Sequence, residues 1–399
     1  MIPEGMHDVL PDEAAELHAI DVALRARFSV YGYGEVRTPA LEFAETLELP
    51  DDDTLSAGYR LFDDRGRELM LRTDMTVPVV RLAAARYRDK PLPLRFFYVG
   101  ASYRPWAPQR SQDGEFLQAG VELLGAPSAE ADAECVTLLC DALEACGLPD
   151  YHVTLNTMAF PTALVDTLGL VEDGDRESLL EALADRDYPL LESIAANAAV
   201  ADEALKALQA ALTLGGTRDS LAQARKLATT PAMVAAIDRL VKVRDLVADA
   251  GYERAVTFDF GLYQDLSYYT GVIFEAWAPG VGLPIASGGR YDGLAAHFDW
   301  EVPGVGFAIA VERLRDALDE AGRLPAVASP ALAFAGGLDE PERVAELRRA
   351  GIAVAALPGD ALPPAPLLRR VGGRYVLELG DGARTEGPWR DIRRALGIA

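Results

Sequence analysis

LRFFYVGASYR at residues 94–104 and FLQAGVELL at residues 116–124 decide the fold, because only a short loop separates them. Both runs are rich in aromatic and aliphatic residues and are bounded by Gly, Pro or Asp, as β-strands are. No helix of crossover length lies between them, so the two strands are expected to pair antiparallel. This argues against a doubly wound sheet and predicts an α+β fold.

Similar patterns extend this prediction in both directions along the chain. Strands are predicted at residues 153–156, 256–260 and 269–278. Apolar residues at helical spacing predict helices at residues 13–31, 76–87 and 128–146, the last with Ser128 as its N-cap.

The character of the sequence changes twice, and these changes predict the domains. Residues 160–249 are rich in Ala and Leu at helical spacing, which predicts a helical insertion that splits one domain in two. A Pro-containing linker at 324–330 precedes a short unit of alternating strands and helices. The expected parts are a core at 1–158 and 251–324, a helical insertion at 159–250, and a small α/β domain at 331–399.

The charge of the chain disfavours stable binding to nucleic acid. Lys and Arg total 38 against 62 Asp and Glu, a formal charge of −24. Residues 331–399 contain ten Arg and nine Asp plus Glu, so nearly all of the negative charge lies before them. A polyanion would be repelled unless basic residues were concentrated on one face.

The remaining global features predict a cytoplasmic protein whose cysteines are reduced. No apolar run is long enough to span a membrane, and residues 1–5 lack the features of a signal peptide. Cys135, Cys140 and Cys146 lie in one predicted helix without metal-site spacing, which favours buried, reduced thiols. Neither a metal nor a cofactor is expected.

Three short blocks contain the residues that could bind a ligand. Gln118 and Glu122 share one strand face, which is either a ligand surface or a solvated polar face. QDLSYYTGVIFE (264–275) contains a tyrosine pair that suits a small ring with hydrogen-bonding nitrogens, although such pairs are more often core residues. GVGFAIAVERL (304–314) reads as a strand that runs into a helix, and its two glycines favour a tight strand entry over a nucleotide loop.

In this order, and together with ASGGRYDGL (286–294), these blocks resemble class II aminoacyl-tRNA synthetases of the histidyl type. GMHDVLP (5–11) and YGEVRTPALE (33–42) resemble the family's opening and its dimer-forming first motif. The resemblance covers about residues 1–320 without the insertion, and implies an antiparallel sheet flanked by helices. The tyrosine and Gly-Gly-Arg-Tyr blocks are histidine-type signatures, so the implied amino acid is histidine.

The resemblance also implies roles for individual residues. Around the imidazole it places Gln118, Glu122, Tyr268 and Tyr269, and at the α-amino group it places Asp74 and Thr76. Asp74 stands where the family usually has glutamate, which shortens its reach by one methylene. Arg104 and Arg313 match the arginines that contact the phosphates of ATP.

Three departures from the family affect the chemistry. Gln264 stands where active synthetases have an arginine, and losing one such cation costs about 2–4 kcal/mol of transition-state stabilisation. The residues of the loop at 105–108, Pro-Trp-Ala-Pro, do not follow the family, and residues 331–399 are too few for its anticodon-binding domain. Adenylation, ATP positioning and tRNA capture are all expected to be weakened.

The preferred hypothesis is a resemblance to the regulatory subunits of ATP phosphoribosyltransferase, non-catalytic paralogues of the synthetases. This implies a short-form catalytic subunit as partner, histidine as effector and self-association through the synthetase-like interface, with no stable tRNA or membrane binding. One alternative is a divergent, active histidyl-tRNA synthetase in which Arg290 replaces the missing cation. Another is an amino-acid ligase with a non-tRNA acceptor. Whether histidine binds in the ancestral pocket or at the partner interface stays open at this stage.

Overall fold

The structure is a computed structural model of the chain. It describes residues 2–48, 58–105, 114–170, 173–184, 187–198, 200–216, 218–262, 268–326, 331–360 and 366–398. The chain divides into two compact units, Met1–Pro325 and Ala326–Ala399, and each is described by itself.

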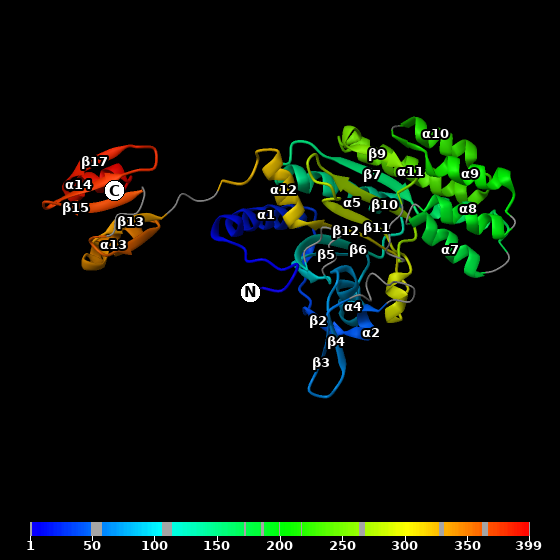
Figure 1. The fold of residues 1–399 in the computed structure, drawn as a ribbon, viewed down its shortest axis with the longest axis horizontal. Helices are drawn as coiled ribbons and strands as arrows, with labels where there is room; N and C mark the ends of the chain where they lie inside the picture. Colours follow the sequence, from blue (N-terminus) through cyan, green and yellow to red (C-terminus); the bar gives the residue numbers. More distant parts are fainter. Residues whose placement is uncertain are drawn as a thin grey trace. The chain divides into compact units, whose positions relative to one another are not determined.

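A nine-stranded sheet forms the centre of the first unit (Figure 1). In spatial order its strands are β1 (Gly34–Glu35), β5 (Leu94–Tyr103), β6 (Glu115–Leu124), β12 (Gly304–Ala310), β11 (Ala286–Arg290), β10 (Val272–Trp277), β7 (His152–Thr157), β9 (Val256–Asp259) and β8 (Gly215–Gly216). β5 and β6 pair antiparallel, as expected, whereas β1–β5 and β7–β9 pair parallel. The predicted α+β fold with a synthetase-like, mainly antiparallel sheet is confirmed.

The central strands are covered on both faces, which explains why β5 is almost continuously apolar. Phe97 belongs to a large cluster on one face, together with α1 (Pro11–Val30), α5 (Ala129–Ala145) and α12 (Val311–Glu320). Phe96 and Tyr98 belong to a second cluster on the other face, with α2 (Ala44–Leu47), α4 (Thr76–Arg86) and the 3-10 helix η3 (Leu294–Phe298). The alternation of side chains along one strand thus separates two cores.

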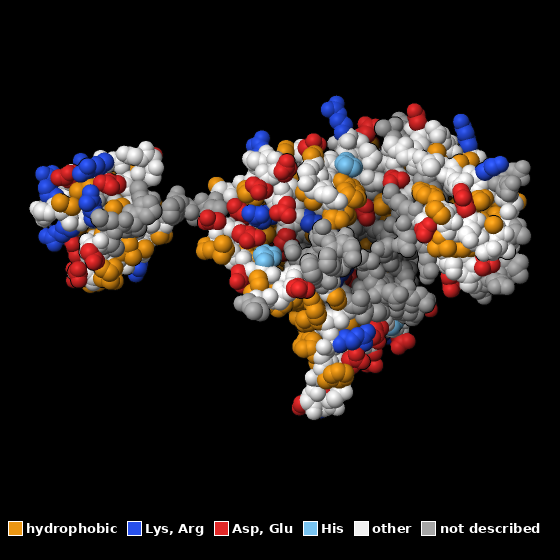
Figure 2. Space-filling model, in the orientation of Figure 1, with side chains coloured by type: hydrophobic (Ala, Val, Ile, Leu, Met, Phe, Trp, Pro, Cys, Tyr) orange, Lys and Arg blue, Asp and Glu red, His pale blue; other side chains and the backbone are white. Residues whose placement is uncertain are grey.

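A small antiparallel sheet lies beside the second cluster. It consists of β2 (Leu41–Phe43), β4 (Glu68–Leu71) and β3 (Arg60–Phe62), in that order. Met70 points into the core, while Leu41, Phe43 and Leu61 are exposed on the other face. Figure 2 shows hydrophobic side chains at the surface over this sheet.

The helical insertion connects two neighbouring strands of the main sheet, β7 and β9. Its helices are α6 (Ala159–Asp166), α7 (Asp173–Ala184), α8 (Tyr188–Asn197), α9 (Asp202–Leu212), α10 (Arg218–Leu227) and α11 (Pro231–Asp249). A parallel pair requires such a crossover. The sequence gives no signal for β8, which consists of two glycines and pairs with the edge strand β9.

The second unit contains a five-stranded sheet. Its spatial order is β14 (Val354–Leu357), β13 (Leu332–Ala335), β15 (Leu367–Val371), β16 (Arg374–Glu378) and β17 (Arg384–Gly387). The helices of this unit are η4 (Gly337–Asp339), α13 (Pro341–Arg349) and α14 (Trp389–Ala395). In the first unit, the 3-10 helix η2 (Glu253–Ala255) lies between α11 and β9. β14, β13 and β15 run parallel, as expected for a small α/β unit.

The start of α5, the cysteines and the helix lengths bear on several local expectations. Ser128 stands at the N-cap of α5, but its side chain makes no capping hydrogen bond, contrary to the predicted cap. All three cysteines are free, with Cys135 and Cys140 buried and Cys146 half-buried. Of the helices within the described ranges, none is both long and apolar enough to cross a membrane. The described residues contain no His, Cys, Asp and Glu grouping suited to a metal ion.

Candidate functional site

A pocket lies over the face of the main sheet where β6, β12 and β11 meet. The register places Glu122 beside Gly306, and Gly306 beside Gly289. Side chains of register partners point to the same face, so this row presents one acid followed by two residues without side chains. The glycines leave room above the sheet for the Glu122 side chain at Gly306 and for the Tyr269 ring at Gly289.

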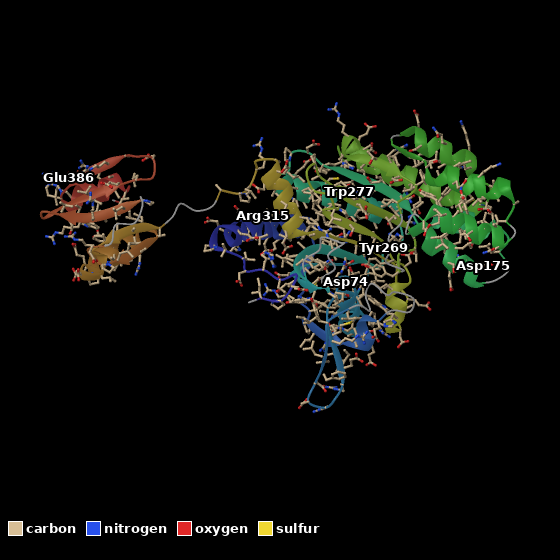
Figure 3. The ribbon with its side chains drawn as sticks, in the orientation of Figure 1. Asp74, Asp175, Tyr269, Trp277, Arg315 and Glu386 are labelled. Atoms are coloured by element: carbon tan, nitrogen blue, oxygen red, sulfur yellow. The ribbon has the colours of Figure 1, made fainter. Side chains whose placement is uncertain are left out.

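The pocket is small and partly open to solvent. Five residues that the resemblance implied for the amino acid line it: Asp74, Thr76, Gln118, Tyr268 and Tyr269. Arg104, Ser287, Tyr291 and residues 306–308 complete the wall. Figure 3 shows the labelled Asp74 and Tyr269 near each other in the middle of the first unit.

Glu122 does not line the pocket but lies beneath its wall. Its side chain is 1% exposed, its Oε1 accepts a hydrogen bond from the Tyr98 hydroxyl at 3.4 Å, and its Oε2 accepts one from Tyr291. Burial raises the pKa of Glu122 to about 8, although the hydrogen bonds from Tyr291 and Thr76 lower it. The carboxyl is therefore mostly protonated at neutral pH, and a neutral acid can both donate and accept a hydrogen bond.

The tyrosine pair forms an aromatic wall. The ring centroids of Tyr268 and Tyr269 lie 4.8 Å apart, and Tyr291 meets Tyr268 edge-on at 5.9 Å. A Cβ at Gly289 would lie 2.8 Å from the Tyr269 ring. The observed position of this ring therefore requires glycine at residue 289. The wall can hold a flat ring by stacking or edge contact while the hydroxyls provide hydrogen bonds.

Asp74 and Gln118 provide polar groups around this wall. Asp74 is buried, accepts a hydrogen bond from the Val77 amide at 3.3 Å, and receives the Tyr268 hydroxyl at 3.5 Å. The amide oxygen of Gln118 accepts a hydrogen bond from the Ser102 hydroxyl at 2.8 Å. A carboxylate opposite hydrogen-bonding aromatic groups suits a ligand with an ammonium group and a polar ring.

The two arginines matched to ATP contacts are placed differently. Arg104 lines the pocket, where its Nε donates to the Thr73 carbonyl at 3.0 Å and its guanidinium lies 5.4 Å from the Phe116 ring centroid. Arg313 is on the first turn of α12, donates to the Pro284 carbonyl at 2.9 Å, and is not part of the pocket wall. The structure therefore does not bring the two together at this pocket.

Arg290 does not supply the cation that the alternative hypothesis required. Its guanidinium is 2% exposed and points to the first turn of α5, where it binds Asp132 at 2.6 Å. The neighbouring Gly289 faces the pocket, so Arg290 faces the opposite side of the sheet by the strand period of two. Gln264 and residues 106–108 lie outside the described residues.

Sequence reasoning missed Tyr98, Ser287 and Tyr291. Tyr98 is the register partner of Gly120 and therefore faces the same side as Gln118 and Glu122. The antiparallel register would have identified it, but a sequence does not fix that register. A Cβ at Gly304 would overlap the Tyr291 ring, and a Cβ at Gly306 would overlap the Glu122 carboxylate. The two glycines therefore make room for these side chains, in addition to forming the start of the strand.

Comparisons with known proteins identify relatives of this chain. The family model described as histidyl-tRNA synthetase matches residues 5–314. A relative from Moorella thermoacetica named ATP phosphoribosyltransferase regulatory subunit is 37% identical, covering 78% of this chain and 80% of its own. One of the same name from Desulfitobacterium hafniense (strain DSM 10664 / DCB-2) is 34% identical over 87% of this chain and 88% of its own.

Solved structures extend the likeness to the fold. A Bacillus halodurans protein described as an ATP phosphoribosyltransferase regulatory subunit/histidyl-tRNA synthetase aligns with a TM-score of 0.78 at 28% identity, covering 92% of this chain and 94% of that one. Histidyl-tRNA synthetase from Nostoc aligns with a TM-score of 0.77 at 20% identity, covering 100% and 98%, and supports the fold alone. The chain belongs to the histidyl-tRNA synthetase family, within the group of the ATP phosphoribosyltransferase regulatory subunits.

Proposed function

We propose that this chain is a non-catalytic regulatory subunit of ATP phosphoribosyltransferase, and that it supports the first step of histidine biosynthesis and its feedback inhibition by histidine. The observation that carries the proposal is a pocket lined by Asp74, Gln118 and the tyrosine pair, in a chain with Gln264 where the synthetases have an arginine. The names of relatives from several bacteria support the same function.

Histidine is the effector that we propose for the pocket. The Asp74 carboxylate would pair with the α-ammonium group, and Thr76 would contribute a hydroxyl beside it. The tyrosine wall and Gln118 would surround the imidazole, with the neutral Glu122 fixing the Tyr291 hydroxyl from below. Calorimetry with the isolated chain should show binding of L-histidine, and Asp74→Ala should weaken it at least tenfold. Equal affinities for the two proteins would contradict the pocket assignment.

Aminoacylation is not part of the proposed function. Among the described residues that line the pocket, Arg104 is the sole cationic side chain, and it also donates to the Thr73 carbonyl. Adenylation develops negative charge at the histidine carboxylate and the α-phosphate, which preorganised cations must stabilise. A histidine-dependent ATP–pyrophosphate exchange assay should give no activity above background. Robust exchange would favour an active synthetase, and ATP consumption without tRNA would favour a ligase with another acceptor.

The proposed partner is the short-form catalytic subunit of ATP phosphoribosyltransferase. Affinity purification of the tagged chain from its source cells should recover that subunit. Phosphoribosyl transfer by the subunit alone should then be compared with transfer by the mixture, with and without histidine. Activation by this chain that histidine reverses is the expected result, because an effector acts through the difference in its affinity for two states.

A second copy of the chain is the proposed partner of the small sheet. Leu41, Phe43 and Leu61 are 42%, 37% and 42% exposed on one face of a three-stranded sheet whose β2 continues the first-motif segment 33–42. An apolar face at a segment that resembles a dimer-forming motif suits an isologous contact between two copies.

A further inference from the structure

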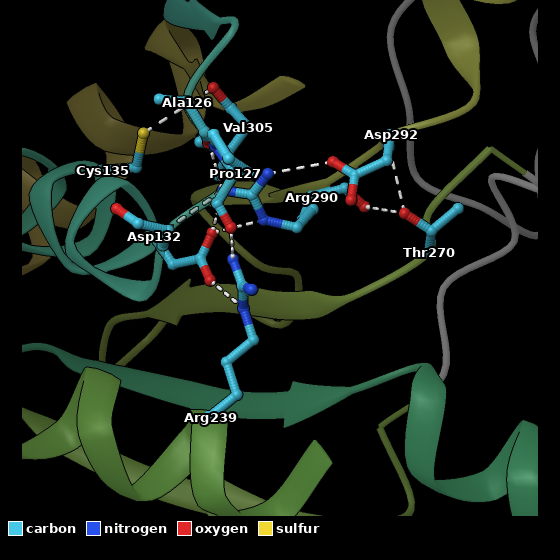
Figure 4. Close-up of polar contacts among 10 residues, drawn as sticks. Ala126, Pro127, Asp132, Cys135, Arg239, Thr270, Arg290, Asp292 and Val305 are labelled. Atoms are coloured by element: carbon cyan, nitrogen blue, oxygen red, sulfur yellow. Dashed lines mark hydrogen bonds and ion pairs between the residues drawn. The ribbon is translucent and has the colours of Figure 1, made fainter. Parts of the chain in front are cut away.

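A buried carboxylate connects three separate elements of the first unit (Figure 4). Asp132, on the first turn of α5, is fully buried, and its Oδ1 accepts a hydrogen bond from Arg290 Nε of β11 at 2.7 Å. Its Oδ2 accepts a hydrogen bond from Arg239 Nε of α11 at 2.6 Å. One carboxylate thus joins the central sheet to the last helix of the insertion.

The guanidinium groups also bind the chain that leads into α5. Arg290 Nη2 donates to the carbonyls of Ala126 at 2.9 Å and Ser128 at 3.4 Å, and Arg239 Nη2 donates to the Pro127 carbonyl at 2.9 Å. Both arginines therefore bind Asp132 and the backbone in front of it. A buried charge held by charge-assisted hydrogen bonds on both oxygens has little freedom to move.

From Arg290 the network reaches the segment that follows the tyrosine pair. The Arg290 carbonyl accepts a hydrogen bond from the Thr270 amide at 2.8 Å, and the aliphatic part of its side chain lies over Gly271, where a Cβ would come within 3.0 Å of Cδ. Asp292 accepts from Arg290 Nη1 at 2.9 Å, and its own amide donates to the Thr270 hydroxyl at 3.0 Å. Thr270 and Gly271 are thus fixed directly after Tyr269.

We infer that Asp132, Arg290 and Arg239 are positioning residues for the tyrosine wall, and that they couple α11 of the helical insertion to occupancy of the pocket. None of the three lines the pocket; they act through Thr270, Gly271 and the sheet position of Gly289. The coupling part of this inference rests on the proposed function, because it takes histidine as the ligand of the pocket. The positioning of residues 268–271 does not, because it can be measured in the protein without ligand.

Arg239 is the residue to change, because its side chain is 29% exposed while Asp132 is completely buried. Loss of a partner from a buried carboxylate risks unfolding, and Arg239→Ala leaves Asp132 paired with Arg290. Lys242→Ala is the matched control, because Lys242 joins the same two helices through Glu130 at 2.5 Å, with both side chains more than half exposed.

Hydrogen exchange on the full chain without ligand is the first measurement. Arg239→Ala should speed exchange in the peptide containing Thr270 relative to wild type, while Lys242→Ala should not. Equal exchange in that peptide for both variants would overturn the inference, whether or not histidine binds.

Calorimetry with L-histidine is the second measurement. Arg239→Ala should weaken binding about 2- to 30-fold, the range of energetic coupling through such networks, and Arg239→Lys should restore part of it. Histidine should also slow exchange in α11 of wild type and of Lys242→Ala but not of Arg239→Ala, since coupling between two sites is reciprocal. Unchanged affinity in Arg239→Ala would refute the coupling alone, whereas absent binding in wild type would refute the proposed histidine pocket.

Discussion

At the scale of single residues, the pocket depends on the absence of side chains as much as on their presence. Gly289 makes room for the Tyr269 ring, Gly306 for Glu122 and Gly304 for Tyr291. Each of these contacts joins residues of different strands or loops, so no local sequence pattern reveals it. The identities of the polar residues suggested a ligand, but only the three-dimensional contacts assign them to a wall or to the layer beneath it.

Gly289→Ala should weaken histidine binding by about tenfold or more, which corresponds to about 1.4 kcal/mol or more, because a binding wall must be held close to its productive geometry. The new Cβ would lie 2.8 Å from both the Tyr269 ring and the Val272 carbonyl, and backbone cannot yield as a flexible side chain can. Gly282→Ala is the control, because nothing lies within 4 Å of its Cβ position. Calorimetry checks both, and matching affinities would show that Tyr269 tolerates displacement.

Glu122 should make the stability of the protein depend on pH. Burial raises its pKa to about 8 in the folded chain, from 4.5, so the folded state retains a proton that the unfolded state releases between these values. The contribution of Glu122 is fully present below the lower value and is lost as pH rises through the upper one. Wild type should therefore lose unfolding free energy relative to Glu122→Gln between about pH 5 and pH 8, by more than about 1.4 kcal/mol. Urea denaturation at both pH values measures the difference; parallel pH profiles would contradict the assignment.

At the scale of elements, β5 and the first-motif segment are held together by one arginine. Arg72 is buried, and its guanidinium donates to the carbonyls of Ala101 and Thr38 at 2.7 Å each. Burial lowers the pKa of Arg72. Asp74 follows two residues later, so the segment proposed for self-association and the pocket are fixed by the same short stretch.

Replacing Phe43 with Asp should convert a dimer to a monomer. The substitution removes the Phe43 ring and places a charge on the face formed with Leu41 and Leu61, and taking a charge out of water in an interface is costly. Light scattering coupled to size exclusion gives the mass directly. Phe62→Asp is the control, because Phe62 is 71% exposed on the other face of the same small sheet. Monomers for both variants, or dimers for both, would reject this face as the contact.

The sequence predicted these elements unevenly. β5, β6 and α4 follow from apolar periodicity and lie close to their predicted bounds. β8 could not be predicted, because two glycines become a strand only by pairing with β9. The position of Ser128 at the N-cap was predicted correctly, but its side chain makes no capping hydrogen bond.

At the scale of the whole molecule, the ligand pocket belongs entirely to the first unit. Every residue that lines it precedes Pro325, and the second unit has its own apolar core around Phe334 and Leu368. A chain ending at Pro325 should therefore bind histidine with an affinity within about twofold of the full chain, because the described residues that line the pocket all belong to the first unit. Calorimetry on both forms tests this, and a large loss of affinity would assign the second unit a part in binding.

The order of strands in the main sheet also determines when the pocket can form during synthesis. β12 lies between β6 and β11, so the sheet half that contains β5 and β6 meets the half that contains β10 and β7 only through it. β12 comprises residues 304–310, which are synthesised after the other strands of the main sheet. The pocket therefore cannot form until this strand has left the ribosome. Folding is limited by such distant pairings. Until β12 docks, the inner edges of β6 and β11 lack their strand partner, and unpaired strand edges favour aggregation.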